Sequence, residues 1–165
     1  AGTDTALMGL WLEGAICLAA TDGRALEVRA NAAPLKQGRE WLAAYFAGRR
    51  PAGGELPLAP EGTPFRQLIW RLLRAIPYGE CVSYGDIARE VGKATHKARM
   101  SSRAVGGAVG ENPISIIIPC HRVVGARGDL TGYGGGITRK IRLLELEGHD
   151  LRRFSLPRRG KYAVK

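Results

Sequence analysis

The chain has 165 residues, with 25 Lys and Arg against 15 Asp and Glu, and a formal net charge of +10. No apolar run approaches the ~18 residues that a membrane span needs, and no signal peptide opens the chain. Its three cysteines are widely spaced and include no CxxC pair, which argues against a disulfide scaffold or a zinc finger and favours a reducing, intracellular compartment.

The positive charge favours a polyanionic partner, and nucleic acid is the leading candidate for a chain of this size. Lys and Arg are spread along the sequence, so we expect a surface that is basic in patches. The alternative is that the charge serves solubility alone.

The first part of the chain predicts a small sheet and one helix. Short apolar segments at residues 7–12, 16–20 and 25–30 predict strands, with an Asp-Gly hairpin signal between the last two. A helix is expected from Pro34 to Ala47 and ends at Gly48. Residues 49–62 are rich in Pro and Gly and predict a linker. The apolar side of the helix is expected to comprise Leu35, Trp41, Leu42, Tyr45 and Phe46.

The second part predicts a mainly helical domain. Thr63 and Pro64 are typical of a helix start, and apolar residues then follow at helical spacing until Pro77. Further helices are expected from Ser83 to about Gly92 and from about Lys97 to Val109, which together predict a helix-turn-helix.

An apolar run and a last helix follow. The β-branched run Ile114–Ile118 predicts a buried strand that ends at Pro119. The last helix is expected from Thr138 to Glu147, with Ile141 and Leu144 facing inward, before a loosely ordered basic tail. The fold class is therefore α/β (α+β), with domains at residues 1–62 and 63–150 and a tail at 151–165.

A thiol and an imidazole follow the expected strand directly. A strand end that presents Cys120 and then His121 is a candidate for an activated nucleophile, because a nearby base can generate the reactive thiolate. The alternative is that Cys120 is a small buried hydrophobe.

Several blocks in one order resemble the O6-alkylguanine-DNA alkyltransferases, or methylated-DNA–protein-cysteine methyltransferases. The resemblance covers roughly residues 63–148. The blocks are Ile76-Pro77-Tyr78-Gly79-Glu80 with Val82-Ser83-Tyr84, residues 101–113, residues 119–124, and Leu130-Thr131-Gly132-Tyr133-Gly134-Gly135-Gly136.

The resemblance implies DNA repair by stoichiometric transfer of a methyl or small alkyl group from O6-alkylguanine, and from O4-alkylthymine, to Cys120. It implies no cofactor and no metal. The partner is double-stranded DNA, bound by a monomer through the minor groove with little sequence preference, and the damaged nucleotide is flipped. The expected location is the cytoplasm, or the nucleus in a eukaryote.

The resemblance also assigns residues. The catalytic set is Cys120, His121 and Glu147, with the carboxylate orienting the histidine. Glu147 is also notable by its position, because an anion at a helix C-terminus is disfavoured and needs a partner. The DNA-binding set is Arg103, which fills the vacated stack, with Tyr84, Ser101 and Ser102. The substrate pocket is lined by Tyr133, Gly134, Gly135, Val123 and Asn112, of which Asn112 is interpreted as structural support.

Two departures from the family pattern affect the expectations. Many members carry Ser at position 134, where this chain has Gly, but the backbone N–H that hydrogen-bonds O6 remains. The N-terminal part matches least: residues 41–50 and 9–14 resemble the family's first domain, but the family usually carries another hairpin strand before the segment that residues 9–14 resemble. Either the N-terminus is truncated or the strands are rearranged, and the sheet topology stays open.

Two other functions remain open at this point. The first is a non-catalytic helix-turn-helix protein that binds alkylated DNA or regulates transcription, against which the presence of Cys120 counts. The second is a Cys-His hydrolase, in which the recognition-helix and Gly-rich matches have no place.

Overall fold

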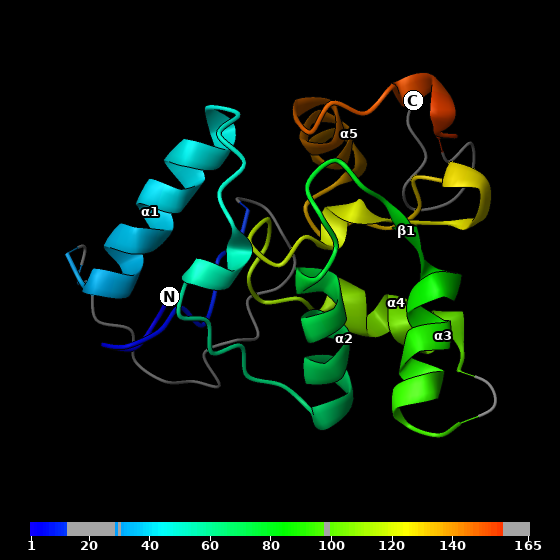
Figure 1. Cartoon of the computed structure of the whole chain (residues 1–165), viewed down its shortest axis with the longest axis horizontal. Coiled ribbons are helices and arrows are strands. Elements are labelled where there is room, and N and C mark those ends of the chain that lie inside the picture. The colour runs from blue at the N-terminus through cyan, green and yellow to red at the C-terminus, as the bar shows by residue number, and fades with distance from the viewer. Residues whose placement is uncertain (13–28, 30, 98–99, 157–165) are drawn as a thin grey trace.

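The computed structural model describes residues 1–12, 29, 31–97 and 100–156. The predicted sheet segments at 16–20 and, apart from residue 29, at 25–30 lie outside the described residues, as do the hairpin between them, Cys17 and the tail beyond residue 156. Within the described part the chain is a helix-dominated α/β protein, and its strands form one parallel pair (Figure 1).

The α-helices of the described part follow one another in the order that the sequence predicts. The bounds of the helices and strands are α1 Ala33–Phe46, η2 Gly53–Glu55, α2 Pro64–Arg74, β1 Val82–Ser83, α3 Tyr84–Ala94, α4 Ser102–Gly110, η3 Cys120–Arg122, β2 Val123–Val124, η4 Ala126–Gly128, α5 Ile137–Leu146 and η5 Leu151–Arg153.

Side-chain caps fix where the helices begin. Thr63 accepts a hydrogen bond from the backbone N–H of Arg66 at 3.3 Å, which confirms the predicted start of α2. Ser83 and Asp86 form a reciprocal capping box at the start of α3. Ser101 caps α4, so this helix begins five residues later than the expected Lys97. The pair α3–α4 confirms the two helices of the predicted helix-turn-helix, and both pack against α2.

The predicted strand at Ile114–Ile118 is wrong. The run is buried as expected, but it folds back on itself: Ser115 bridges Ile118, and Ile116 has a φ of +70°. A left-handed φ is uncommon for a β-branched residue and marks a locally strained backbone. The strand beside the predicted active site is instead β2, which follows the Cys-His pair and lies parallel to β1, with Val82 opposite Val123.

The N-terminal part departs from the prediction in its packing. Leu7 forms isolated bridges to Gly2 and Leu58, and Leu10 forms one to Ile114, so residues 1–12 attach to the second part of the chain. Residues 49–62 are packed rather than a bare linker, since Leu56 is buried. The domain division at residue 62 stays a prediction.

One apolar core extends through both parts. Leu7, Tyr45, Ile69 and Ile118 belong to the same buried cluster, and a smaller cluster surrounds Leu144.

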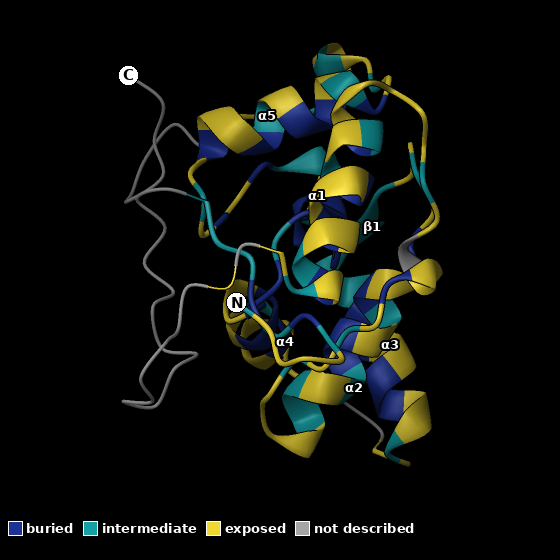
Figure 2. Cartoon of the chain, turned by 90° about the vertical axis from the view of Figure 1, so that its left-hand side faces the viewer, coloured by how far each residue is buried: buried dark blue, intermediate teal, exposed yellow. Residues whose placement is uncertain are grey.

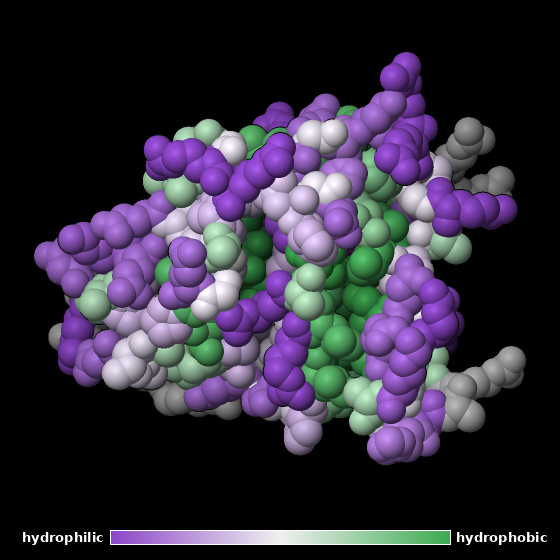
Figure 3. Space-filling view, viewed as in Figure 1, coloured by the Kyte–Doolittle hydropathy of each residue, from purple (hydrophilic) through white to green (hydrophobic). Residues whose placement is uncertain are grey.

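α1 confirms the predicted helix, but Phe46 is 55% exposed, because Trp41 and Tyr45 lie on the side that faces the core. Figure 2 shows the exposed outer sides of α1 and α5. In Figure 3, apolar residues gather over the region of α2 and α3 between hydrophilic zones.

The last helix and the residues after it pack more closely than predicted. α5 begins one residue before the expected Thr138; Leu144 is buried and Ile141 is half-buried. Residues 151–153 form η5, and Ser155 bridges Asp129, so the start of the expected tail is ordered. No helix in the described part is long and apolar enough to cross a membrane.

Candidate active site

Cys120 lies at the start of η3, directly after the folded-back apolar run. The thiol is buried, with 7% of the residue exposed. The turn is tight on both sides: the backbone N–H of Cys120 donates to the carbonyl of Ile118 at 2.8 Å, and that of Val123 donates to the carbonyl of Cys120. The local fold therefore holds the sulfur on a short, rigid turn instead of at a strand end.

Asn112 connects α4 to this turn. Its Nδ2 lies 3.0 Å from the Cys120 sulfur and 2.8 Å from the carbonyl oxygen of Ile118, while its Oδ1 accepts from the N–H of Ile114 at 3.0 Å. The side chain therefore supports the folded-back run, as the sequence suggested, and also reaches the thiol. A donor at this sulfur stabilises the thiolate more than the thiol.

His121 is fully buried, and a carboxylate fixes its orientation. Nε2 lies 2.8 Å from Oε1 of Glu147, the residue at the C-terminal cap of α5. Since Glu147 can only accept a hydrogen bond when ionised, Nε2 carries the hydrogen in the neutral ring. The other nitrogen, Nδ1, is buried and has no hydrogen-bond partner within the described part. It is thus available as a base.

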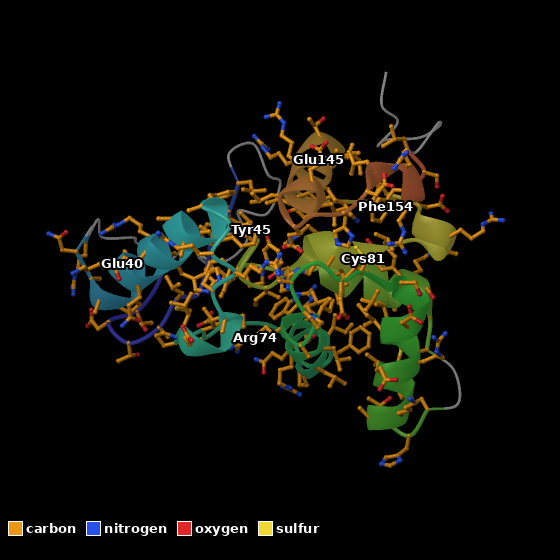
Figure 4. The ribbon with its side chains drawn as sticks, turned by 45° about the horizontal axis from the view of Figure 1, so that its top comes forward. Glu40, Tyr45, Arg74, Cys81, Glu145 and Phe154 are labelled. Carbon is orange, nitrogen blue, oxygen red and sulfur yellow. The ribbon has the colours of Figure 1, made fainter. Side chains whose placement is uncertain are left out.

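Glu147 receives hydrogen bonds from three other residues of the chain. Tyr45 on α1 donates its hydroxyl to Oε1 at 2.7 Å, and Arg122 donates through Nε and Nη2 at 2.8 Å. The backbone N–H of Gly79 reaches Oε2 at 3.2 Å. Figure 4 shows Tyr45 at the end of α1 that faces the rest of the molecule. Arg122 also donates to the carbonyl of Ile76, so the residues just after α2 are connected to the same network.

Burial and hydrogen bonding set the charge states. Burial acts to raise the pKa of Glu147, but hydrogen bonds from His121, Arg122 and Tyr45 hold that pKa far below its usual range. Burial lowers the pKa of His121 despite the carboxylate beside it. The carboxylate therefore stays ionised at neutral pH, and the imidazole is a neutral base.

The thiol is in a less favourable environment for ionisation. Burial raises the pKa of Cys120, while the hydrogen bond from Asn112, the charge of Lys140 and nearby backbone N–H groups act in the opposite direction. A thiol that stays protonated at rest needs a base to remove its proton when it reacts. Nδ1 of His121, the next residue in the sequence, is the candidate for that base.

The Gly-rich loop at residues 130–136 lies against this site. Tyr133 is buried, its hydroxyl has no hydrogen-bond partner among the described residues, and the Cys120 charge contributes to its raised pKa after burial. Gly134 is exposed. A Cβ on Gly135 would lie 2.5 Å from Cδ1 of Leu12 and 2.8 Å from a ring carbon of Tyr133, so a larger residue there would displace these side chains. Tyr84 donates its hydroxyl to the carbonyl of Thr131 at 3.3 Å.

Three of the four predicted DNA-binding residues lie at the start of α4, and the fourth, Tyr84, lies at the start of α3. Ser101, Ser102 and Arg103 are all exposed, and Ser101 is also the helix cap. A Cβ on Gly107 would meet nothing within 4 Å, so packing inside the protein does not require that glycine. The exposed side of α4 is thus open to close approach by a partner. Val123, which the sequence analysis assigns to the substrate pocket, is fully buried in β2, and its backbone N–H donates to the carbonyl of Cys120.

Sequence reasoning misses three residues at this site. The helical pattern places Tyr45 on an apolar helix side, Arg122 enters only as part of the Cys-His motif, and Lys140 receives no role. Lys140 and Glu147 are charged residues spaced seven apart on the buried side of α5, which is a signal that the sequence offers. Among the described residues, no group of His, Cys, Asp and Glu is placed to hold a metal ion.

Known proteins match much of this chain in sequence. The family described as 6-O-methylguanine DNA methyltransferase, DNA binding domain, matches residues 64–149. A methylated-DNA–protein-cysteine methyltransferase of Mycobacterium tuberculosis is 56% identical over 106 residues, which cover 64% of this chain and 61% of that protein. One of Salmonella typhimurium is 49% identical over 110 residues, covering 67% and 61%. The match thus spans about three fifths of these relatives.

Solved structures give the same result for the fold. The chain resembles Mycobacterium tuberculosis OGT in complex with DNA, with a TM-score of 0.63, 50% identity, and coverage of 73% of this chain and 69% of that one. It also resembles the O6-methylguanine-DNA methyltransferase of Pyrococcus kodakaraensis, with a TM-score of 0.57, 32% identity, and coverage of 76% and 71%. From the family match and these relatives, the chain belongs to the 6-O-methylguanine DNA methyltransferase family.

Proposed function

We propose that the chain repairs alkylated DNA by moving a methyl or small alkyl group from O6 of guanine to the sulfur of Cys120. The observation that carries the proposal is the buried Cys120 thiol on a rigid turn, next to a histidine that Glu147 holds through Nε2 at 2.8 Å. O4-alkylthymine presents the same kind of alkyl–oxygen bond and is a second substrate.

The transfer is a single displacement at carbon. The thiol proton passes to Nδ1 of His121, directly or through a water, and the sulfur attacks the alkyl carbon. The S–C bond forms as the C–O6 bond breaks, and the electron pair of the C–O6 bond stays on O6 of the departing guanine. The thiol proton ends on the guanine, so the normal base is restored. A thioether is stable, so each molecule reacts once.

DNA is the partner in which the proposed substrate base occurs. We infer that double-stranded DNA binds along the exposed side of α4, through the minor groove and with little sequence preference, because the residues there are small and one long cation, Arg103, extends from them. Reaching O6 requires that the nucleotide leave the stack, and Arg103 fills the gap. Tyr133, Gly134 and Gly135 line the pocket for the flipped base.

A non-catalytic DNA-binding protein is the competing function. It would need the helix-turn-helix but neither the buried thiol nor the histidine and carboxylate behind it. The ordered contacts from Asn112 to the sulfur and from Glu147 to His121 favour transfer over binding alone.

The first prediction concerns the acceptor. Cys120→Ser is expected to lose methyl transfer while retaining DNA affinity, because an alcohol near neutral pH is a far weaker nucleophile than a thiol beside a base. The measurement is methyl uptake from a duplex with one O6-methylguanine, alongside a binding titration. Cys81→Ser is the matched control and should transfer normally. Transfer by Cys120→Ser, or its loss in Cys81→Ser, would contradict the assignment.

The second prediction concerns His121 and Glu147 as a pair. Either His121→Ala or Glu147→Gln alone is expected to slow transfer, and the double variant should be little slower than the worse single one, because residues that act as a unit are non-additive. Single-turnover rates on the same duplex measure this. Losses that add fully in log rate would mean that the two residues act separately.

The third prediction concerns Arg103. Arg103→Ala is expected to slow repair of a duplex at saturating DNA by about tenfold or more, since flipping costs a few kcal/mol, and to leave the reaction with free O6-benzylguanine nearly unchanged. A mismatched lesion, which is cheaper to extrude, should recover part of the loss. Arg89→Ala on α3 is the control for an exposed arginine. A variant that only binds DNA more weakly, with a normal saturated rate, would rule out the stacking role.

A further inference from the structure

Lys140 is a buried cation that the proposed reaction does not use. It lies in the middle of α5 and is fully buried, and its Nζ donates to the carbonyl of Val123. Among the described residues, no carboxylate lies within ion-pair distance of it. A buried charge is costly unless another group compensates it, so this ammonium needs an electrostatic partner.

Two thiols lie close enough to interact with this ammonium when either of them is ionised. Burial lowers the pKa of Lys140 to about 8, and the groups that act to raise it are Cys120 and Cys81. The pKa of Cys81 is raised to about 11, mainly by burial, so this thiol stays protonated at neutral pH. Cys81 also contacts Nε2 of His149 at 3.5 Å, away from the histidine of the site. In the proposed reaction it is Cys120 whose sulfur becomes negatively charged, so Cys120 is the thiol whose developing charge Lys140 can offset.

The position of Lys140 on α5 explains how it reaches the nucleophile. It precedes Glu147 by seven residues, about two helical turns, so both side chains lie on the buried side of the helix. Glu147 contacts His121 in η3, and Lys140 contacts Val123 directly after η3. Val123 in turn donates its N–H to the carbonyl of Cys120. One helix thus holds the reactive turn at two points.

The other groups around the thiol and this ammonium do not replace it. Arg122 is committed to Glu147, His121 is a neutral base whose pKa Lys140 lowers further, and Tyr133 carries a raised pKa and stays neutral. Among these neighbours, Lys140 is the cation whose charge acts directly on the thiol.

We propose that Lys140 is a positioning residue for the nucleophile: its ammonium fixes the Val123 carbonyl beside the reactive turn and offsets the negative charge that forms on the Cys120 sulfur. The inference rests on the proposed function, in which this sulfur attacks the alkyl carbon. Lys140 gives up no proton during alkyl transfer, so the bonds and protons exchanged between Cys120, His121 and guanine stay as described for the proposed function.

The test separates the charge of Lys140 from its hydrogen bond. K140Q removes the charge and keeps a donor for the Val123 carbonyl, K140M removes both, and R142Q removes an exposed charge from the same helix as the control. The measurement is the rate at which iodoacetamide labels Cys120 across a pH series, resolved by peptide mapping. Thermal unfolding of each variant checks that the fold is kept.

K140Q and K140M are both expected to raise the apparent pKa of Cys120 by about one unit, which makes labelling about tenfold slower near neutral pH. All proteins should converge at high pH, and R142Q should match the unaltered chain. A K140Q profile equal to that of the unaltered chain, or a loss that is the same at every pH, would overturn the proposal. K140Q keeps this test decisive if K140M fails to fold.

Methyl transfer from an O6-methylguanine duplex, measured on the same proteins, distinguishes the two proposals. Iodoacetamide reports on the thiol without DNA. If the unaltered chain takes up no methyl group but the K140Q shift is found, the proposed function fails and the assignment of Lys140 to the thiol stands. If the unaltered chain and K140Q transfer at equal rates across the pH series, the inference fails alone.

Discussion

The buried carboxylate of Glu147 is the constraint on which the rest of the site depends. It receives the hydroxyl of Tyr45, the guanidinium of Arg122, the ring of His121 and the backbone N–H of Gly79. A buried anion is costly to leave unpaired, and losing one partner of such a pair typically costs about 3–5 kcal/mol. The elements that carry these donors are therefore held in one arrangement by a single charge.

This arrangement gives each reactive group a fixed state. Because Glu147 stays ionised and faces Nε2, His121 keeps its hydrogen on that nitrogen and leaves Nδ1 as the basic one. Burial keeps the ring neutral, and it also keeps the thiol of Cys120 protonated at rest. The thiol is thus protected until a substrate and a base act on it together, which suits the proposed transfer, in which each molecule reacts once.

The network also joins parts of the chain that the sequence assigns to different domains. Tyr45 comes from α1 and is stacked on Trp41, with ring centroids 5.4 Å apart, so a helix of the N-terminal part contributes directly to the carboxylate's environment. The aromatic pair makes the hydroxyl position rigid, since both side chains are buried. Folding of the first part and readiness of the site are therefore physically linked.

Local sequence signals predicted the helices well and the turn beside the site poorly. Thr63 and Ser83 are caps whose effect is confined to one helical turn, so their positions could be predicted directly. The run Ile114–Ile118 has the composition of a strand, but Asn112 and the bridge from Leu10 fold it back, and those contacts arise only in the tertiary structure.

The predicted site residues divide in the same way. Cys120 and His121 are adjacent in sequence, and the approach of Glu147 to the histidine was expected from a resemblance, not from spacing. Tyr45 could not be assigned to Glu147 from the sequence, because 102 residues separate the two. Arg122 could not be assigned either, because nothing local distinguishes it from any other basic residue after a Cys-His pair.

The most direct test of this account is the protonation of the two ring nitrogens of His121, measured by heteronuclear NMR on the intact chain near neutral pH. The account predicts a neutral ring with its hydrogen on Nε2 and an unprotonated Nδ1. In Glu147→Gln, the preference of the hydrogen for Nε2 over Nδ1 should be weaker. A neutral ring with its hydrogen on Nδ1, or an imidazolium at neutral pH, would contradict it.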